Sequence, residues 1–174
     1  MLRHMALSLG CLIFLAGSAY ATDKTVERGK YLVAVIGCGD CHTPGSFLGK
    51  PDMSKYLAGS DVGFAMPGMG VFVAPNLTSD KETGLGNWTR EQIVAATTKG
   101  QRPDGRILAP IMPWNDLAHL TKTDALAIAA YLKSLLAVRN KVPGPFGPSE
   151  KASVFVFSVQ PGDVYNGLPK PPAQ

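Results

Sequence analysis

Residues 38–42 read Cys-Gly-Asp-Cys-His, a spacing that can hold a haem covalently. Two thiols with two residues between them can add across the vinyl groups of the porphyrin, and a histidine directly after the second cysteine can bind the iron. Cys38 and Cys41 are therefore predicted to form thioethers to haem c, with His42 as one axial iron ligand. The pentapeptide occurs once, so one haem is predicted.

Other uses of a cysteine pair fit the neighbouring residues less well. A thioredoxin-like dithiol usually follows a strand, and a zinc site needs two further ligands in addition to the two cysteines. The third cysteine is Cys11, inside a predicted export signal, and the other histidine after that signal is His119. A structural disulfide suits an exported protein. The adjacent histidine nevertheless favours haem.

The sixth position of the iron decides what the haem can do, because an open position allows gas binding or peroxide chemistry and a filled one leaves electron transfer. The candidate ligands are Met53, Met66, Met69, Met112 and His119. Met112 is favoured because Pro110 and Pro113 restrict the backbone on both sides of it. Methionine also commonly fills a hydrophobic core, and Met66 and Met69 are the main competing ligands.

The first 21 residues have the pattern of a secretory signal peptide. Arg3 and His4 precede an almost continuous apolar run over residues 5–17, and an Ala-x-Ala pattern follows at residues 19–21. Cleavage after Ala21 and a periplasmic location are predicted. The alternative is a retained membrane anchor, since the run is close to the shortest length that spans a bilayer.

One domain is predicted over residues 22–142. Apolar residues at helical spacing predict a helix over 25–36 and a second from about 121 to 138, and a Thr-x-x-Gln capping box opens another over 90–99. Residues 43–86, rich in Gly, Pro and Met, are predicted to form a long structured loop.

Residues 143–174 form a Pro- and Gly-rich extension with one strand-like run over 154–159. A tail that wraps the domain and buries this aromatic run is favoured, because an exposed run would invite pairing with other chains. The alternative is a docking segment for a partner subunit. The formal net charge of +4 is scattered along the chain, so nucleic acid is not expected as a partner.

Several stretches, taken together, resemble the class I c-type cytochromes, and within them the cytochrome c subunits of bacterial periplasmic alcohol, gluconate and aldehyde dehydrogenases. The similarity extends over residues 27–142. It rests on the pentapeptide with Thr43-Pro44, on Ala-Pro-Asn-Leu-Thr at 74–78, Thr-Gly-Leu-Gly at 83–86, Pro-Asp-Gly at 103–105 and Met-Pro at 112–113.

The resemblance implies an all-α class I cytochrome c fold with long Gly/Pro-rich loops and an irregular C-terminal extension. The first and last helices would cross, with Gly29 allowing their close approach and Tyr131 packed at the crossing. Met112 matches the axial methionine of the family. Asn76 and Trp88 would lie near the haem propionates.

The resemblance also implies an electron carrier and not a catalytic enzyme. It would take single electrons from a periplasmic dehydrogenase, as its acceptor or subunit, and pass them through an oxidase or another cytochrome to the respiratory chain. The related subunits typically carry three haem domains, whereas this chain has one pentapeptide, which favours a soluble carrier or a small accessory subunit. A haem enzyme or sensor with a labile sixth ligand, and a haem-free redox or structural module, are the alternatives.

Overall fold

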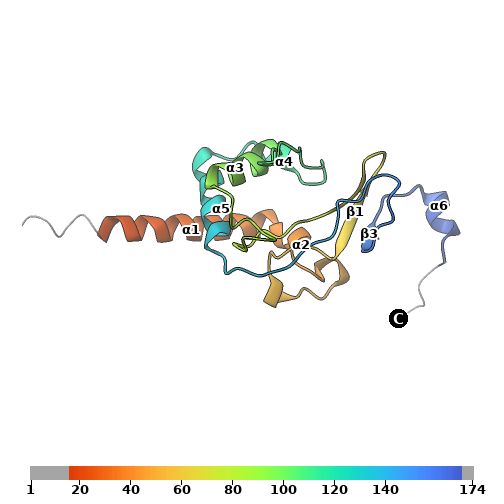
Figure 1. Ribbon diagram of the computed structural model, residues 1–174, viewed down its shortest axis with the longest axis horizontal. Coiled ribbons are helices and arrows are strands. Elements are labelled where there is room, and N and C mark those ends of the chain that lie inside the picture. Colours follow the sequence, from red (N-terminus) through yellow and green to blue (C-terminus); the bar gives the residue numbers. More distant parts are fainter. Residues whose placement is uncertain (1–15, 170–174) are drawn as a thin grey trace, which may run out of the picture.

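The computed structural model describes residues 16–169. The helices are α1 (Ala16–Ile36), α2 (Cys38–His42), α3 (Arg90–Lys99), α4 (Trp114–Leu117), α5 (Lys122–Ser134) and α6 (Gly162–Gly167), with 3₁₀ turns η1 (Ser46–Leu48) and η2 (Met53–Lys55) and strands β1 (Val62–Met66), β2 (Gly70–Val73) and β3 (Phe155–Phe157). Figure 1 shows the helical region, with α1, α3, α4 and α5, at one end and the strands toward the other, with α6 beyond them.

The signal-peptide prediction concerns residues 1–21, most of which lie outside the described residues; residues 16–21 are helical, within α1. Within residues 16–169, none of the helices is both long and apolar enough to cross a bilayer.

The prediction of a helix over 90–99 is confirmed. The Thr89 hydroxyl accepts from the Gln92 backbone nitrogen at 3.2 Å, and the Gln92 side chain accepts from the Thr89 nitrogen at 2.9 Å. This reciprocal capping satisfies two amides that the first turn leaves free. Gly100 ends the helix at φ 66°, a left-handed conformation that suits glycine.

The last predicted helix begins as expected but ends early. Thr121 caps it by accepting from the Asp124 nitrogen at 3.1 Å. The helix stops at Ser134, four residues before the predicted end near Val138, and Leu135 is extended. The Leu135 carbonyl accepts from the Ser79 hydroxyl and the Val138 carbonyl from the Asn76 amide, so hydrogen bonds to a distant loop replace further helical ones.

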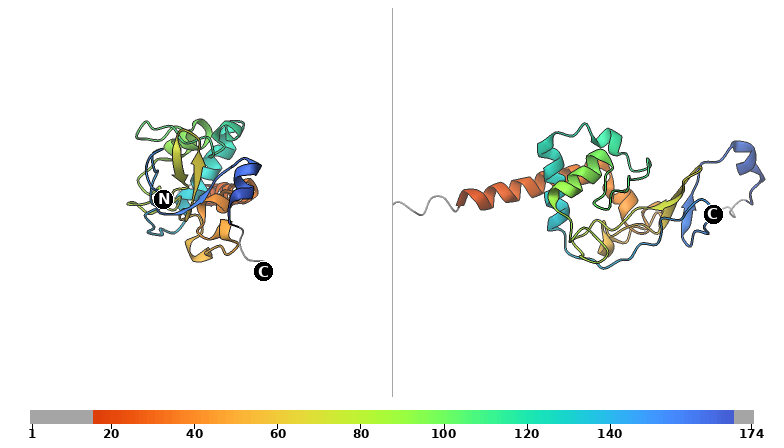
Figure 2. Two further views of the ribbon diagram at one scale, coloured as in Figure 1. Left: turned by 90° about the vertical axis from the view of Figure 1, so that its right-hand side faces the viewer. Right: turned by 45° about the horizontal axis from the view of Figure 1, so that its top comes forward.

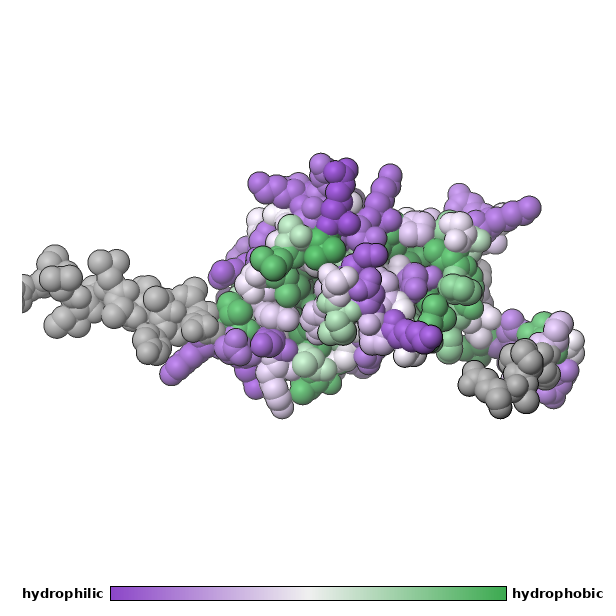
Figure 3. Space-filling view, turned by 90° about the horizontal axis from the view of Figure 1, so that it is seen from below, coloured by the Kyte–Doolittle hydropathy of each residue, from purple (hydrophilic) through white to green (hydrophobic). Residues whose placement is uncertain are grey.

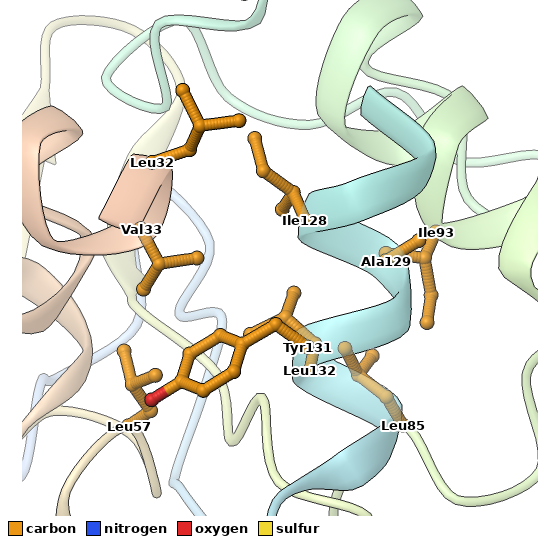
Figure 4. Packing of buried hydrophobic residues seen from close by; sticks show 9 residues of the cluster. All are labelled: Leu32, Val33, Leu57, Leu85, Ile93, Ile128, Ala129, Tyr131 and Leu132. Atoms are coloured by element: carbon orange, nitrogen blue, oxygen red, sulfur yellow. The ribbon is translucent and has the colours of Figure 1, made fainter. Parts of the chain in front are cut away.

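The crossing of α1 and α5 forms the centre of the core. A Cβ on Gly29 would lie 2.0 Å from the Ala127 carbonyl oxygen, so only glycine allows the two backbones to come this close. Val33 of α1 and Ala129 of α5 are fully buried. Figure 4 shows Tyr131 extending from α5 toward Leu57. The roles predicted for Gly29 and Tyr131 are confirmed.

The prediction of an all-α fold is incomplete, because a three-stranded sheet in the order β2-β1-β3 accompanies the helices. β1 and β2 are antiparallel, with Met66 opposite Gly70, inside the segment that was predicted to be a loop. Pro67 and Gly68, at φ 72°, occupy the central positions of the turn, which the Met69 nitrogen closes on the Met66 carbonyl. Pro-Gly at these positions is typical of a type II turn.

The C-terminal extension wraps the domain but does not bury its aromatic residues, so that part of the prediction is wrong. β3 pairs in parallel with β1, with Phe155 opposite Val62, and the Phe146 backbone exchanges two hydrogen bonds with Val71. Phe155 is 65% exposed and Phe157 is 54% exposed. Figure 2 shows the extension reaching beyond the strands, and Figure 3 shows hydrophobic residues at the surface toward α6.

Candidate functional site

The pentapeptide forms the short helix α2, separated from α1 by Gly37 in a left-handed conformation. Cys38 and Cys41 are half-buried and are not joined by a disulfide. Burial raises the pKa of Cys38 to about 11, and burial followed by the charge of Asp40 raises the pKa of Cys41. Two thiols that stay protonated at neutral pH do not resemble a reactive dithiol, whose nucleophilic cysteine has a lowered pKa.

The described part of the chain offers no further ligands for a protein zinc site. Within residues 16–169, no three side chains of His, Cys, Asp or Glu come together in a way that could hold a metal ion. Structural zinc sites need four such ligands in tetrahedral arrangement.

His42 is held in one orientation. It is 6% exposed, and its Nδ1 lies 2.7 Å from the Pro75 carbonyl oxygen. Burial lowers the pKa of His42, while the bond to Pro75 opposes that shift. A neutral imidazole that donates its Nδ1 hydrogen to a carbonyl keeps its Nε2 lone pair for a metal, and such a second bond fixes the orientation of a ligating histidine.

The chain around α2 is fixed by the loop that follows it. The Gly59 nitrogen donates to the His42 carbonyl at 2.8 Å, and the buried Thr43 hydroxyl accepts from the Leu57 nitrogen at 3.1 Å. The ring of Tyr56 lies over Gly39, where a Cβ would come within 2.9 Å of it. Contacts within the protein therefore hold α2 in a defined position.

Met112 lies in the connection between α3 and α4 and is half-buried. Its nitrogen donates to the Ala109 carbonyl at 3.0 Å, and its carbonyl accepts from the Trp114 nitrogen at 2.7 Å. The Trp114 ring packs on Gly100, and its indole nitrogen donates to Leu108 at 3.3 Å. The backbone of Met112 is thus ordered by contacts on both sides.

The competing ligands are placed differently. Met53 is 63% exposed and Met69, in the β1–β2 turn, is 46% exposed, whereas Met66 is half-buried at the end of β1. His119 is exposed after α4. Burial therefore separates Met112 and Met66 from the other candidates, and the assignment of Met112 to the iron stays a prediction.

Asn76 is buried, at 2% exposed, and its amide is fully used within the protein. It donates to the Thr83 hydroxyl and the Val138 carbonyl and accepts twice from Thr78. An amide has two donor hydrogens, so none is free for a propionate. The location of Asn76 near the haem propionates stays a prediction. At that location Asn76 would order the surrounding loop but would donate no hydrogen bond to a propionate.

Trp88 has its donor available. Its ring packs against the core, and the Arg102 guanidinium lies 5.1 Å from the ring centroid. In the part of the chain that the structure describes, the indole nitrogen has no hydrogen-bond acceptor within reach. Trp88 therefore retains the donor that its predicted place near the propionates would need.

Thr43 and Pro75 belong to stretches that carry the family resemblance, but no role at this site was predicted for them or for Asn140. Pro75 acts through its carbonyl, which every residue type has, so its residue type does not reveal this contact. Asn140 lies 98 residues after His42 in the chain, and only the fold brings it to the same loop.

The donor set fits a covalently bound haem c. Two free thiols lie on one short helix. The Nδ1 of the buried His42 next to them is held by the Pro75 carbonyl, and its Nε2 lone pair is unused. These are the groups that form the two thioethers and the proximal iron bond in c-type cytochromes.

Comparisons with known proteins agree with this geometry. The Cytochrome c family model matches residues 26–136. The chain is 34% identical over 128 residues to the fructose dehydrogenase cytochrome subunit of Gluconobacter japonicus, covering 70% of this chain and 25% of that protein. It is 30% identical over 171 residues to the cytochrome c subunit of the quinone alcohol dehydrogenase of Gluconobacter oxydans, covering 91% of this chain and 34% of that protein.

A third relative is the gluconate 2-dehydrogenase cytochrome c subunit of Pantoea cypripedii, 34% identical over 128 residues, which are 73% of this chain and 27% of that protein. The chain spans about a quarter to a third of the length of these curated relatives. The resemblance noted from the motifs is confirmed. The matched residues include the second half of α1, the pentapeptide and all of α5, and the chain belongs to the cytochrome c family.

Proposed function

We propose that the chain binds one haem c through Cys38 and Cys41, with His42 and Met112 as axial iron ligands, and carries single electrons. The observation that supports this most directly is the 2.7 Å contact between the His42 Nδ1 and the Pro75 carbonyl, which leaves Nε2 for the iron. When bound, the haem supplies a centre that gains and loses one electron.

The residues of the chain would act by holding the two ligands still. His42 is fixed by Pro75, and Met112 stands in a connection ordered by Ala109 and Trp114. Ligands that keep one geometry in both oxidation states leave little structure to reorganise during transfer. A thioether ligand and burial both favour the reduced state, so we expect a fairly high reduction potential.

The partner that we propose is a periplasmic dehydrogenase, with the chain as its electron acceptor or cytochrome subunit. The support is that the relatives are named as cytochrome subunits of fructose, alcohol and gluconate dehydrogenases. Electrons would then pass to an oxidase or another cytochrome of the respiratory chain. Export by the signal predicted over residues 1–21 would bring the chain to the compartment where haem c is attached in bacteria.

Purified protein from cells that can attach haem tests the proposal. We expect a mass above that of the polypeptide by one haem, sharp reduced α and β bands, and a far-red methionine-to-iron band when oxidised. An unchanged polypeptide mass would refute the covalent haem. High-spin spectra, or carbon monoxide binding to the untreated reduced protein, would instead favour an enzyme or sensor with a labile ligand.

The sixth ligand is tested by Met112→Ala with Met69→Ala as the matched control. Loss of the Met112 sulfur should lower the reduction potential, abolish the far-red band and open the iron to exogenous ligands. Met69→Ala should change none of these, because that side chain is half exposed in the β1–β2 turn. The reverse result would assign the iron to the other methionine.

A further inference from the structure

His42 is held from two sides by chain segments distant in sequence. Its imidazole donates to the Pro75 carbonyl at 2.7 Å, and its own carbonyl accepts from the Gly59 nitrogen at 2.8 Å. The two supporting segments are also joined, because the Ser60 nitrogen donates to the Ala74 carbonyl at 2.9 Å. The orientation of the imidazole therefore depends on what keeps residues 58–60 and 74–77 in place.

Asn76 fixes the acceptor of the imidazole hydrogen. The Pro75 carbonyl belongs to a planar peptide that includes the nitrogen and Cα of Asn76. The Asn76 Nδ2 donates to the Val138 carbonyl at 2.7 Å and to the Thr83 hydroxyl at 3.0 Å, and its Oδ1 accepts from the Thr78 nitrogen at 2.9 Å. These bonds fix one end of the peptide plane that presents the carbonyl.

Asn140 holds the segment of residues 58–60, which contacts the His42 backbone. Its Nδ2 donates to the Ala58 carbonyl at 2.8 Å, one residue before the glycine that contacts the His42 backbone. Its backbone nitrogen donates to the Thr83 hydroxyl at 3.1 Å. Both supports of His42 thus lead to residues 138–140, the clasp segment, which follows the end of α5 at Ser134.

We propose that the clasp segment holds the His42 imidazole in its iron-binding orientation, with Asn76 and Asn140 as positioning residues. This rests on the proposed function, in which His42 is the iron ligand. A well-aligned bond from Nδ1 makes the imidazole a stronger donor, and a stronger donor favours the oxidised iron. Loosening the clasp should therefore weaken that bond and shift the redox equilibrium toward the reduced form.

The variants Asn140→Ala and Asn76→Ala test the proposal in the haem-loaded protein. Asn87→Ala is the matched control, since its Nδ2 also donates to a carbonyl, that of Lys81 at 2.8 Å, but it has no link to Pro75. Redox equilibrium with a reference cytochrome should move about threefold toward reduced protein for Asn140→Ala and about tenfold for Asn76→Ala. Tenfold equals about 59 mV for one electron.

The His42 Nδ1 proton resonance of the reduced protein is a second readout. We expect it to shift, and to exchange faster with water, in both clasp variants and not in Asn87→Ala. A purely structural role would lower the unfolding temperature while leaving the resonance and the redox equilibrium unchanged, and that result would overturn the proposal.

Asn76→Ala removes four hydrogen bonds, and a failure of this variant to fold would leave Asn140→Ala to decide, because Asn140 keeps its backbone bond to Thr83. The two proposals fail in different ways. Wild-type protein without covalent haem refutes the proposed function, whereas haem-loaded Asn140→Ala that matches Asn87→Ala in both readouts refutes the clasp alone.

Discussion

The crossing of α1 and α5 and the sheet of β1–β3 use their hydrophobic residues in opposite ways. At the crossing, Val33 and Ala129 are fully buried and Tyr131 is 9% exposed. In the sheet, Phe64 is buried but Phe155 and Phe157 of β3 are more than half exposed. Since apolar burial is the main stabilising contribution to folding, the crossing should set the stability of the domain, and β3 should contribute little.

The largest loss in the free energy of unfolding is expected from Tyr131→Ala. The ring fills the core between α5 and Leu57 (Figure 4). Removing a buried aromatic ring leaves a cavity, so the free energy of unfolding should fall by about 4 kcal/mol. Urea denaturation of the haem-loaded protein measures it. Tyr131→Phe keeps the ring and should lose less than about 1 kcal/mol; equal losses in the two variants would contradict the packing argument.

Gly29→Ala tests how close the two helices must be. The added Cβ would lie 2.0 Å from the Ala127 oxygen and 2.8 Å from the Tyr131 Cβ, so the helices must separate. We expect a loss of roughly 3 kcal/mol, as in overpacked cores. Gly162→Ala in α6 is the control, because a Cβ there meets nothing within 4 Å. Similar unfolding midpoints for the two variants would show that the crossing can relax.

The two regions also differ in how far the sequence predicts them. The capping box at Thr89, the stop at Gly100 and the start at Thr121 are local signals, and the structure confirms all three. The close approach at Gly29 was implied by the family resemblance and is also confirmed. Short-range patterns therefore predict where α3 begins and ends and where α5 begins.

The sheet depends on long-range pairing that such patterns do not report. β3 pairs with β1 across about ninety residues, and its side chains have no alternating burial to mark a face. The early end of α5 has the same origin, because the hydrogen bonds that replace its last turn come from Asn76 and Ser79.

The candidate site shows the same division between local motifs, which the sequence predicts, and long-range contacts, which it does not. Cys38, Cys41 and His42 form a local motif, and the structure places them on one short helix. The carbonyl of Pro75 and the amide of Asn140 reach this site only through the fold. A backbone carbonyl and an asparagine outside any motif have no signature that sequence analysis could have used.

Phe157→Ala tests the contribution of the sheet region. Phe157 contacts the rings of Phe47 and Phe64 at centroid distances of 6.4 and 5.9 Å, but half of it faces solvent. Loss of these partial contacts should cost less than about 1 kcal/mol. Phe155→Ala, at a more exposed position with no such ring contact to the described residues, should cost less still. A loss as large as that of Tyr131→Ala would remove the distinction between the two regions.

The smallest effect is expected from the ion pair between Arg28, in the middle of α1, and Asp124, in the first turn of α5. The Arg28 Nε lies 2.8 Å from the Asp124 Oδ1, and the side chain of Arg28 is half exposed. The hydrogen bond from Arg28, then that from Thr121, lowers the pKa of Asp124 below its ordinary value. The stabilisation is therefore complete above about pH 4, the ordinary value for an unfolded aspartate, and is lost as the pH falls through the lowered folded pKa.

Urea denaturation of wild type and Asp124→Asn between pH 6 and pH 3 measures this contribution. The stability difference should be small at pH 6, because exposed ion pairs contribute little, and should shrink toward pH 3. Added salt should reduce it at pH 6 by screening. A difference that stays constant with pH would mean that the charge of Asp124 does not carry its contribution to stability. The crossing would then owe its stability to packing alone, with no measurable help from the charges at its rim.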